Sequence, residues 1–151
     1  FYAATYGIAT VGAFGVIAVI ERGGACQQMS DLAGLHRRSP VLAATLAVCV
    51  LSLAGIPPLA GFFGKFIVFT EALKAGGPTS APGSLAILAI ALSAVALYYY
   101  LLILKQSPVA GPPAGRSASI EVPPGARLGL YGTMILLLVL GIAPSVVLRL
   151  F

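Results

Sequence analysis

The stretch Ser52–Phe66, SLAGIPPLAGFFGKF, combines features that an ordinary membrane-spanning helix avoids. Pro57 and Pro58 each remove a backbone donor, and the first of them also disfavours helical angles in the residue before it. Gly55, Gly61 and Gly64 remove side-chain bulk on both sides of the prolines. Lys65 follows in a phenylalanine-rich apolar setting. A helix break and an ionisable group are both costly in lipid, so their coincidence requires an explanation.

The composition of the whole chain indicates a membrane protein. Its 151 residues are 59% hydrophobic and 9% charged, whereas soluble domains carry roughly 25% charged residues. The net charge of +5 does not predict nucleic-acid binding, because the nine Lys and Arg residues are spread along the chain. Cys26 and Cys49 lack metal-ligand spacing and predict neither a disulfide nor a redox site. We therefore expect a lipid bilayer, and no nucleic acid, around the chain.

The start of the sequence predicts a longer protein. Phe1 opens an apolar run without the basic leading region or the small-residue cleavage site of a signal peptide. We expect the chain to be the C-terminal part of a longer protein, with a processed chain as the alternative. Its length fits a single domain.

Apolar runs predict an all-α integral membrane fold with about four transmembrane helices and no soluble domain, so residues 1–151 form one transmembrane domain. The predicted spans are residues 1–20, 40–73, 84–104 and 128–148. Ser39 and Pro40 predict the start of the second span, because serine caps helices and proline is tolerated at the first helical position.

The second span is too long for one straight helix. At about 1.5 Å per residue it would extend roughly 50 Å, compared with a hydrocarbon core of about 30 Å. Two half-helices joined at Gly55–Pro58 fit the bilayer well. One long helix kinked at the prolines is the alternative.

Loop charges predict the orientation. The loops at 21–39 and 105–127 must lie on one side of the membrane. Together they contain Arg22, Arg37, Arg38, Lys105, Arg116 and Arg127, whereas the opposite side has Lys74 and Arg149. Cytoplasmic loops carry the excess of Lys and Arg, so we expect both loops to be cytoplasmic.

Lys65 is the main candidate for chemistry, and two interpretations are open. Its long stem would allow the ammonium to reach the outer interface, which would be a structural role. Alternatively, the side chain faces the interior of a helix bundle, where desolvation favours the neutral amine and makes proton loss and gain feasible. Backbone freed at the break would help to hydrate such a path, because non-helical backbone at membrane depth lines cavities.

The remaining polar residues are weaker candidates. Glu71 is a secondary candidate that either pairs with Lys74 or lies near a proton exit, and a solvated helix end is the favoured interpretation. We expect His36 to be an ordinary exposed histidine at the lipid headgroups. Tyr98–Tyr100 are expected to form an interface belt. No other motif predicts a cofactor, metal or catalytic centre.

Four segments resemble the C-terminal part of subunit N of the proton-translocating NADH–quinone oxidoreductase, respiratory complex I, which corresponds to chain 2 of the mitochondrial enzyme. They are TYGIATVGAFGVIAVI, DLAGLHRRSPVLAATLAV, SLAGIPPLAGFFGKF and ALYYYLL. The ending Gly64-Lys65-Phe66 is similar to that of subunit N, whereas subunit M has an acidic residue there. Subunit L and the Mrp cation/proton antiporters have Ser-Lys-Asp or Ser-Lys-Glu. The resemblance is weakest in residues 106–127 and the last span.

The resemblance implies part of an antiporter-like bundle of about fourteen helices, with two inverted repeats that each contain a broken helix. It implies that Lys65 is the terminal proton-carrying lysine, near the outlet to the outer side. The other pump residues of the family, a glutamate and two lysines, have no counterpart here. NADH, flavin, iron–sulfur clusters and quinone are expected on partner subunits, and no redox centre on this chain.

The resemblance thus implies a proton-translocating membrane-arm subunit in a bacterial inner membrane, with other membrane-arm subunits as partners. One alternative is a subunit of a multisubunit cation/proton antiporter or a membrane-bound hydrogenase. The other is a structural membrane scaffold, in which Lys65 faces lipid.

Overall fold

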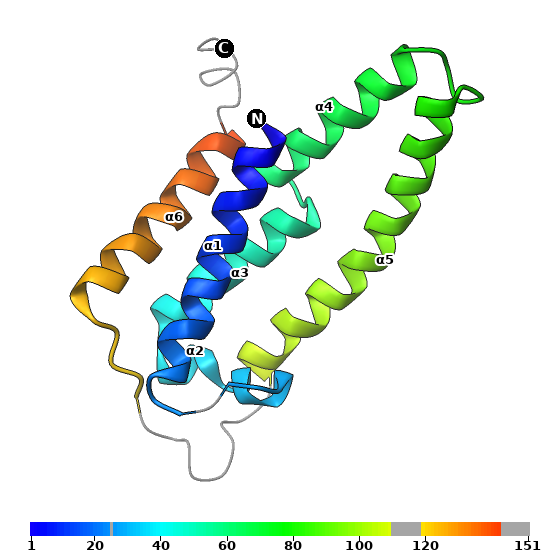
Figure 1. Cartoon of the computed structure of the whole chain (residues 1–151). Coiled ribbons are helices and arrows are strands. Elements are labelled where there is room, and N and C mark those ends of the chain that lie inside the picture. The colour runs from blue at the N-terminus through cyan, green and yellow to red at the C-terminus, as the bar shows by residue number, and fades with distance from the viewer. Residues whose placement is uncertain (25, 110–118, 143–151) are drawn as a thin grey trace.

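The computed structural model describes residues 1–24, 26–109 and 119–142, and these ranges contain helices and no strands. The elements are α1 (Tyr2–Glu21), the 3-10 helix η1 (Met29–Leu32), α2 (Leu35–Arg38), α3 (Pro40–Ala54), α4 (Ala60–Lys74), α5 (Ala81–Val109) and α6 (Pro124–Ile142) (Figure 1). The predicted all-α class and the break in the second apolar run are confirmed.

Within the described residues, three helices, α1, α5 and α6, are long and apolar enough to cross a membrane, and α3 is a shorter apolar helix. Helices α1, α3 and α6 pack against one another as the centre of the fold (Figure 1). Their contact surface contains buried aliphatic side chains such as Val16, Leu42 and Leu130. At Gly12 a side chain would lie 2.6 Å from Cys49 Sγ, so the absence of one lets α1 and α3 approach closely.

Helices α4 and α5 form an antiparallel pair beside this centre (Figure 1). The outer surface of α5 carries exposed apolar side chains, among them Leu85, Leu88, Leu92 and Val95. A helix this apolar and this exposed is suited to contact with lipid or with other transmembrane helices. The structure thus agrees with an integral membrane protein.

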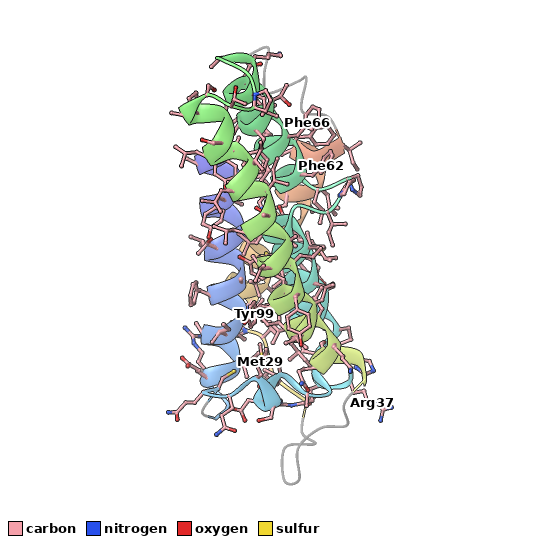
Figure 2. The ribbon with its side chains drawn as sticks, turned by 90° about the vertical axis from the view of Figure 1, so that its right-hand side faces the viewer. Met29, Arg37, Phe62, Phe66 and Tyr99 are labelled. Carbon is pink, nitrogen blue, oxygen red and sulfur yellow. The ribbon has the colours of Figure 1, made fainter. Side chains whose placement is uncertain are left out.

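Several short segments meet at one end of the bundle. The Gly34 N–H donates to Gln106 O at 3.3 Å, and the Ile120 N–H donates to Arg38 O at 3.1 Å. Figure 2 shows Met29 and Arg37 at this end and Phe62 with Phe66 at the opposite end. The described parts of the loops predicted at 21–39 and 105–127 therefore lie at the same end of the bundle.

Some predicted boundaries differ from the structure. The loop predicted at 105–127 is too long at both ends, because α5 continues to Val109 and α6 already begins at Pro124. Proline fits the first helical position, where no N–H donor is required, so it starts this helix instead of preventing it. Residues 143–148 of the last predicted span, with Arg116 and Arg149, lie outside the described residues.

The predicted start of α3 at Ser39 and Pro40 is confirmed, but the predicted capping by the serine side chain is wrong. Ser39 is the N-cap residue and Pro40 occupies the first turn, yet the Ser39 hydroxyl makes no capping hydrogen bond. Ser39 is buried, and its own N–H donates to Leu35 O at 2.8 Å. The residue therefore joins α2 to α3 through its backbone.

The prediction that His36 is an ordinary exposed histidine is wrong. The side chain is half-buried, and its Nδ1 lies 2.8 Å from Ser107 O. Because a carbonyl only accepts, Nδ1 carries the proton of this hydrogen bond. His36 thus links α2 to the end of α5, across 71 positions of sequence.

His36→Ala should loosen this end of the bundle while leaving the helices in place. Loss of one hydrogen bond of about 1 kcal/mol raises the population of the open state roughly fivefold. Hydrogen–deuterium exchange at the amides of Gly34 and Ile120 should accelerate by that factor. Arg37→Ala is the matched control, since Arg37 is exposed on the same short helix. Equal exchange in the two variants would contradict the proposed link.

Candidate functional site

The carboxyl end of α3 is closed by backbone hydrogen bonds around Gly55. Gly55 has φ +83° and ψ +40°, a left-handed conformation that glycine adopts without strain. Its N–H donates to Ser52 O at 3.0 Å, and the Ile56 N–H donates to Leu51 O at 3.1 Å. These two bonds form a Schellman closure, which pairs carbonyl groups that the helix would otherwise leave free.

Pro57 and Pro58 form the crossing between the two half-helices. The Leu59 N–H donates to Ile56 O at 3.1 Å across the prolines, and α4 begins at Ala60. Neither proline has an N–H, so a turn of this composition leaves few donors to be satisfied at membrane depth. The structure thus places the predicted break residues together as one tight connection.

A side chain of α3 and the backbone of α4 hold the half-helices together. The Gly61 N–H donates to Ser52 Oγ at 3.2 Å, and Ser52 is 1% exposed. A Cβ at Gly61 would overlap the Ser52 carbonyl oxygen, and one at Gly141 of α6 would overlap the Pro58 carbonyl oxygen. The break is therefore packed directly against backbone on two sides, which only residues without side chains permit.

Lys65 turns back from α4 toward this break. Its Nζ donates to Ala54 O at 3.3 Å, and its stem passes over Gly55, where a Cβ would lie 3.1 Å from Lys65 Cδ. The carboxyl end of a helix carries partial negative charge, so the end of α3 favours the ammonium, by about 0.3–2 kcal/mol. Lys65 is half-buried.

The direction of Lys65 separates the two interpretations drawn from the sequence. A lysine that reaches the outer interface would extend toward the carboxyl end of α4, whereas this side chain contacts the carboxyl end of α3. It also lines a small cavity together with residues of α1, including Thr5 and Tyr6. Lys65 therefore faces other helices of the bundle.

The structure does not bring Glu71 to Lys65. Glu71 Oε1 lies 2.8 Å from Lys74 Nζ, and both side chains are about two-thirds exposed, at 65% and 66%. An exposed pair of this kind contributes at most about 1 kcal/mol. Glu71 thus fits the solvated helix end that the sequence favoured.

The tyrosines of α5 divide between two environments. Tyr98 and Tyr99 are exposed, at 61% and 58%, and Figure 2 shows Tyr99 on the outward side of α5. Tyr100 is partly buried against the aliphatic core. In the part of the chain that the structure describes, no group of three His, Cys, Asp or Glu side chains is placed to hold a metal ion.

Sequence reasoning did not predict Ser52 and Thr5 as parts of this site, and it treated Gly61 only as a small residue beside the break. The signal for Ser52 was present, since a hydroxyl in the last turn before a helix break can satisfy the freed backbone. For Gly61 the glycine spacing was visible, but its contact with α3 was not. Thr5 lies 60 positions from Lys65 in the sequence, and no local pattern relates the two.

The fold and the site define a class of protein. An apolar helix bundle with a helix broken by glycine and proline, and with an ionisable side chain at the break, is the construction of transporter-type integral membrane proteins. A family model described as NADH:quinone oxidoreductase/Mrp antiporter, TM, matches residues 1–94. The chain belongs to this family.

Similar proteins of known name are subunit N of NADH-quinone oxidoreductase. The chain is 48% identical over 149 residues to NADH-quinone oxidoreductase subunit N 2 of Acidobacterium capsulatum, covering 99% of this chain and 30% of the relative. It is 41% identical over 146 residues to subunit N of Polaromonas naphthalenivorans, covering 96% and 29%. The chain thus spans about 30% of the length of these relatives.

The fold is also similar to a solved structure of respiratory complex I from Thermus thermophilus with bound aureothin. The TM-score is 0.74 at 34% sequence identity, and the match covers 96% of this chain and 33% of the other chain. The predicted resemblance to subunit N is confirmed by these matches.

Gly61→Ala should force the half-helices apart, because the new methyl group would meet the Ser52 carbonyl. Overpacking of this kind costs about 1–3 kcal/mol, and we expect a lower melting temperature for the complex that contains the variant. Gly132→Ala is the matched control: it lies within α6, where a Cβ meets nothing within 4 Å. If both variants melt alike, the close contact between α3 and α4 is not required.

Proposed function

We propose that the chain is part of a proton-translocating membrane-arm subunit of NADH–quinone oxidoreductase, in which Lys65 transfers protons within the membrane. The names of the relatives support the assignment to this enzyme. These names apply to proteins more than three times as long as this chain. The observation that carries the role of Lys65 is its position: an ammonium at the carbonyl end of an interrupted helix, facing other helices.

The position of Lys65 suits proton transfer for a physical reason. Its described partner is the carbonyl dipole of Ala54, which favours the ammonium less strongly than a full negative charge does. Arrival or departure of a charge nearby therefore changes the balance between ammonium and amine. Conformational and electrostatic change in partner subunits would drive protonation and deprotonation in this way.

The redox chemistry belongs to other subunits in this proposal. NADH, flavin, iron–sulfur clusters and quinone are assigned to partner subunits. We place the chain in a bacterial inner membrane, with the loops around 21–39 and 105–127 on the cytoplasmic side. The excess of Lys and Arg in these loops supports this orientation.

A second candidate is a subunit of a cation/proton antiporter, since the matching family includes Mrp antiporters by its description. The two candidates differ in their partners. Purification of the full-length subunit from native membranes with its stably bound partners should recover NADH-oxidising subunits in the first case. Recovery of antiporter subunits without NADH-oxidising activity would favour the second.

Lys65→Met should abolish or strongly reduce proton pumping by the assembled complex, because methionine keeps the apolar stem and removes the ionisable group. Pumping is measured in proteoliposomes as the pH gradient formed per NADH oxidised. Lys74→Met is the control, since Lys74 is an exposed lysine of the same helix. An assembled Lys65→Met complex that pumps like the unmodified one would exclude the proposed role and favour a structural scaffold.

A further inference from the structure

We infer that Thr5 of α1 and Ser52 of α3 form a binding site for one water molecule beside Lys65, and that this water is the next carrier of the lysine proton. The inference rests on the proposed function of Lys65 and extends it to a second helix. It assigns a role to the Thr5 hydroxyl and a further role to the Ser52 hydroxyl, which also accepts from the Gly61 N–H at the break.

A small cavity separates Lys65 from α1. Its volume is about 10 Å³, which is roughly the space that one water molecule needs. The cavity is lined by three helices, with Tyr2, Thr5, Tyr6 and Ala9 from α1, Ser52 and Leu53 from α3, and Gly61 and Lys65 from α4. Thr5 and Ser52 are each 1% exposed, so their hydroxyl groups are shielded from bulk solvent.

The polar groups around the cavity retain the hydrogen-bonding capacity that a water requires. Lys65 Nζ donates to Ala54 O, which uses one of the three donors of an ammonium. Ser52 Oγ accepts from the Gly61 N–H, so its own proton is available to donate. Thr5 Oγ1 donates to Tyr2 O at 3.0 Å, so its lone pairs are available to accept.

One water satisfies all three groups together. It accepts from Lys65 Nζ and from Ser52 Oγ, and it donates to Thr5 Oγ1, which gives the three hydrogen bonds typical of a buried water. In this arrangement Thr5 fixes the direction of the water, because an acceptor on α1 turns one water O–H away from the lysine. Thr5 and Ser52 are thus positioning residues for the transfer.

The transfer involves only the making and breaking of N–H and O–H bonds. Lys65 gives a proton from Nζ to the water and becomes a neutral amine, while the water passes one of its own protons to a solvent water nearer the N-terminus of α1. Tyr2 and Tyr6 line the cavity, and their rings lie 6.0 Å apart along α1. Tyr2 and Tyr6 are 36% and 45% exposed, so solvent can approach the cavity from their side.

Thr5→Val tests the site, because valine has nearly the same shape and lacks the hydroxyl. In the assembled complex, proton pumping per NADH oxidised should fall at least about fivefold, as expected for the loss of one hydrogen bond. Thr5→Ser restores the hydroxyl and should restore pumping, whereas a role of the threonine methyl group in packing would not be rescued by serine. Thr10→Val is the matched control, since Thr10 makes the same kind of bond, to Tyr6 O at 2.8 Å, outside this cavity.

Normal pumping in Thr5→Val would overturn the inference. It would leave the role of Lys65 intact if Lys65→Met is inactive, whereas normal pumping in Lys65→Met would overturn the proposed function itself. If the complex with Thr5→Val does not assemble, Thr5→Ala is measured in its place, because alanine is smaller than threonine and introduces no new contact. Pumping in Thr5→Ala should fall in the same way, and normal pumping there would equally overturn the inference.

Discussion

A helix that ends inside a bilayer leaves amide and carbonyl groups that water cannot reach, and the rest of this fold depends on how these groups are paired. Gly55 turns the backbone so that the last carbonyls of α3 accept from the turn itself. The Ser52 hydroxyl accepts from the first turn of α4, and the Lys65 ammonium donates to the carbonyl of Ala54. The interruption is therefore held by hydrogen bonds within the chain.

The same break provides the hydrogen-bond partner of the Lys65 ammonium. In the described part of the chain, Lys65 is held by a carbonyl dipole, whereas Lys74 on the same helix is held by a carboxylate. A helix dipole stabilises an ammonium less than a full negative charge does. The packing at the break needs backbone-to-backbone contact at Gly61 and Gly141. The close packing of the two half-helices and the contact of Lys65 with Ala54 thus belong to the same break.

Sequence reasoning was most successful where the signal was local. The apolar runs and the prolines predicted an all-α membrane fold with a broken second run, and the segment around Lys65 resembled subunit N. The prediction was less accurate for the loop at 105–127, because a proline that forbids the interior of a helix is well suited to its first turn. His36 was misjudged for a different reason: its partner, Ser107, belongs to a distant helix.

The sequence by itself determined that the chain lies in a membrane and where its helix breaks. Both follow from the residues themselves, since apolar side chains favour lipid and the prolines of Gly55–Pro58 disturb a helix. The choice between two half-helices and one kinked helix came from the structure, in which α3 ends at Ala54 and α4 begins at Ala60. Only the tertiary structure decided that Lys65 turns toward Ala54 and that Thr5 lies across a water-sized cavity from it. The direction of a long flexible side chain depends on which neighbouring helices offer a partner, and those neighbours are brought together only by folding.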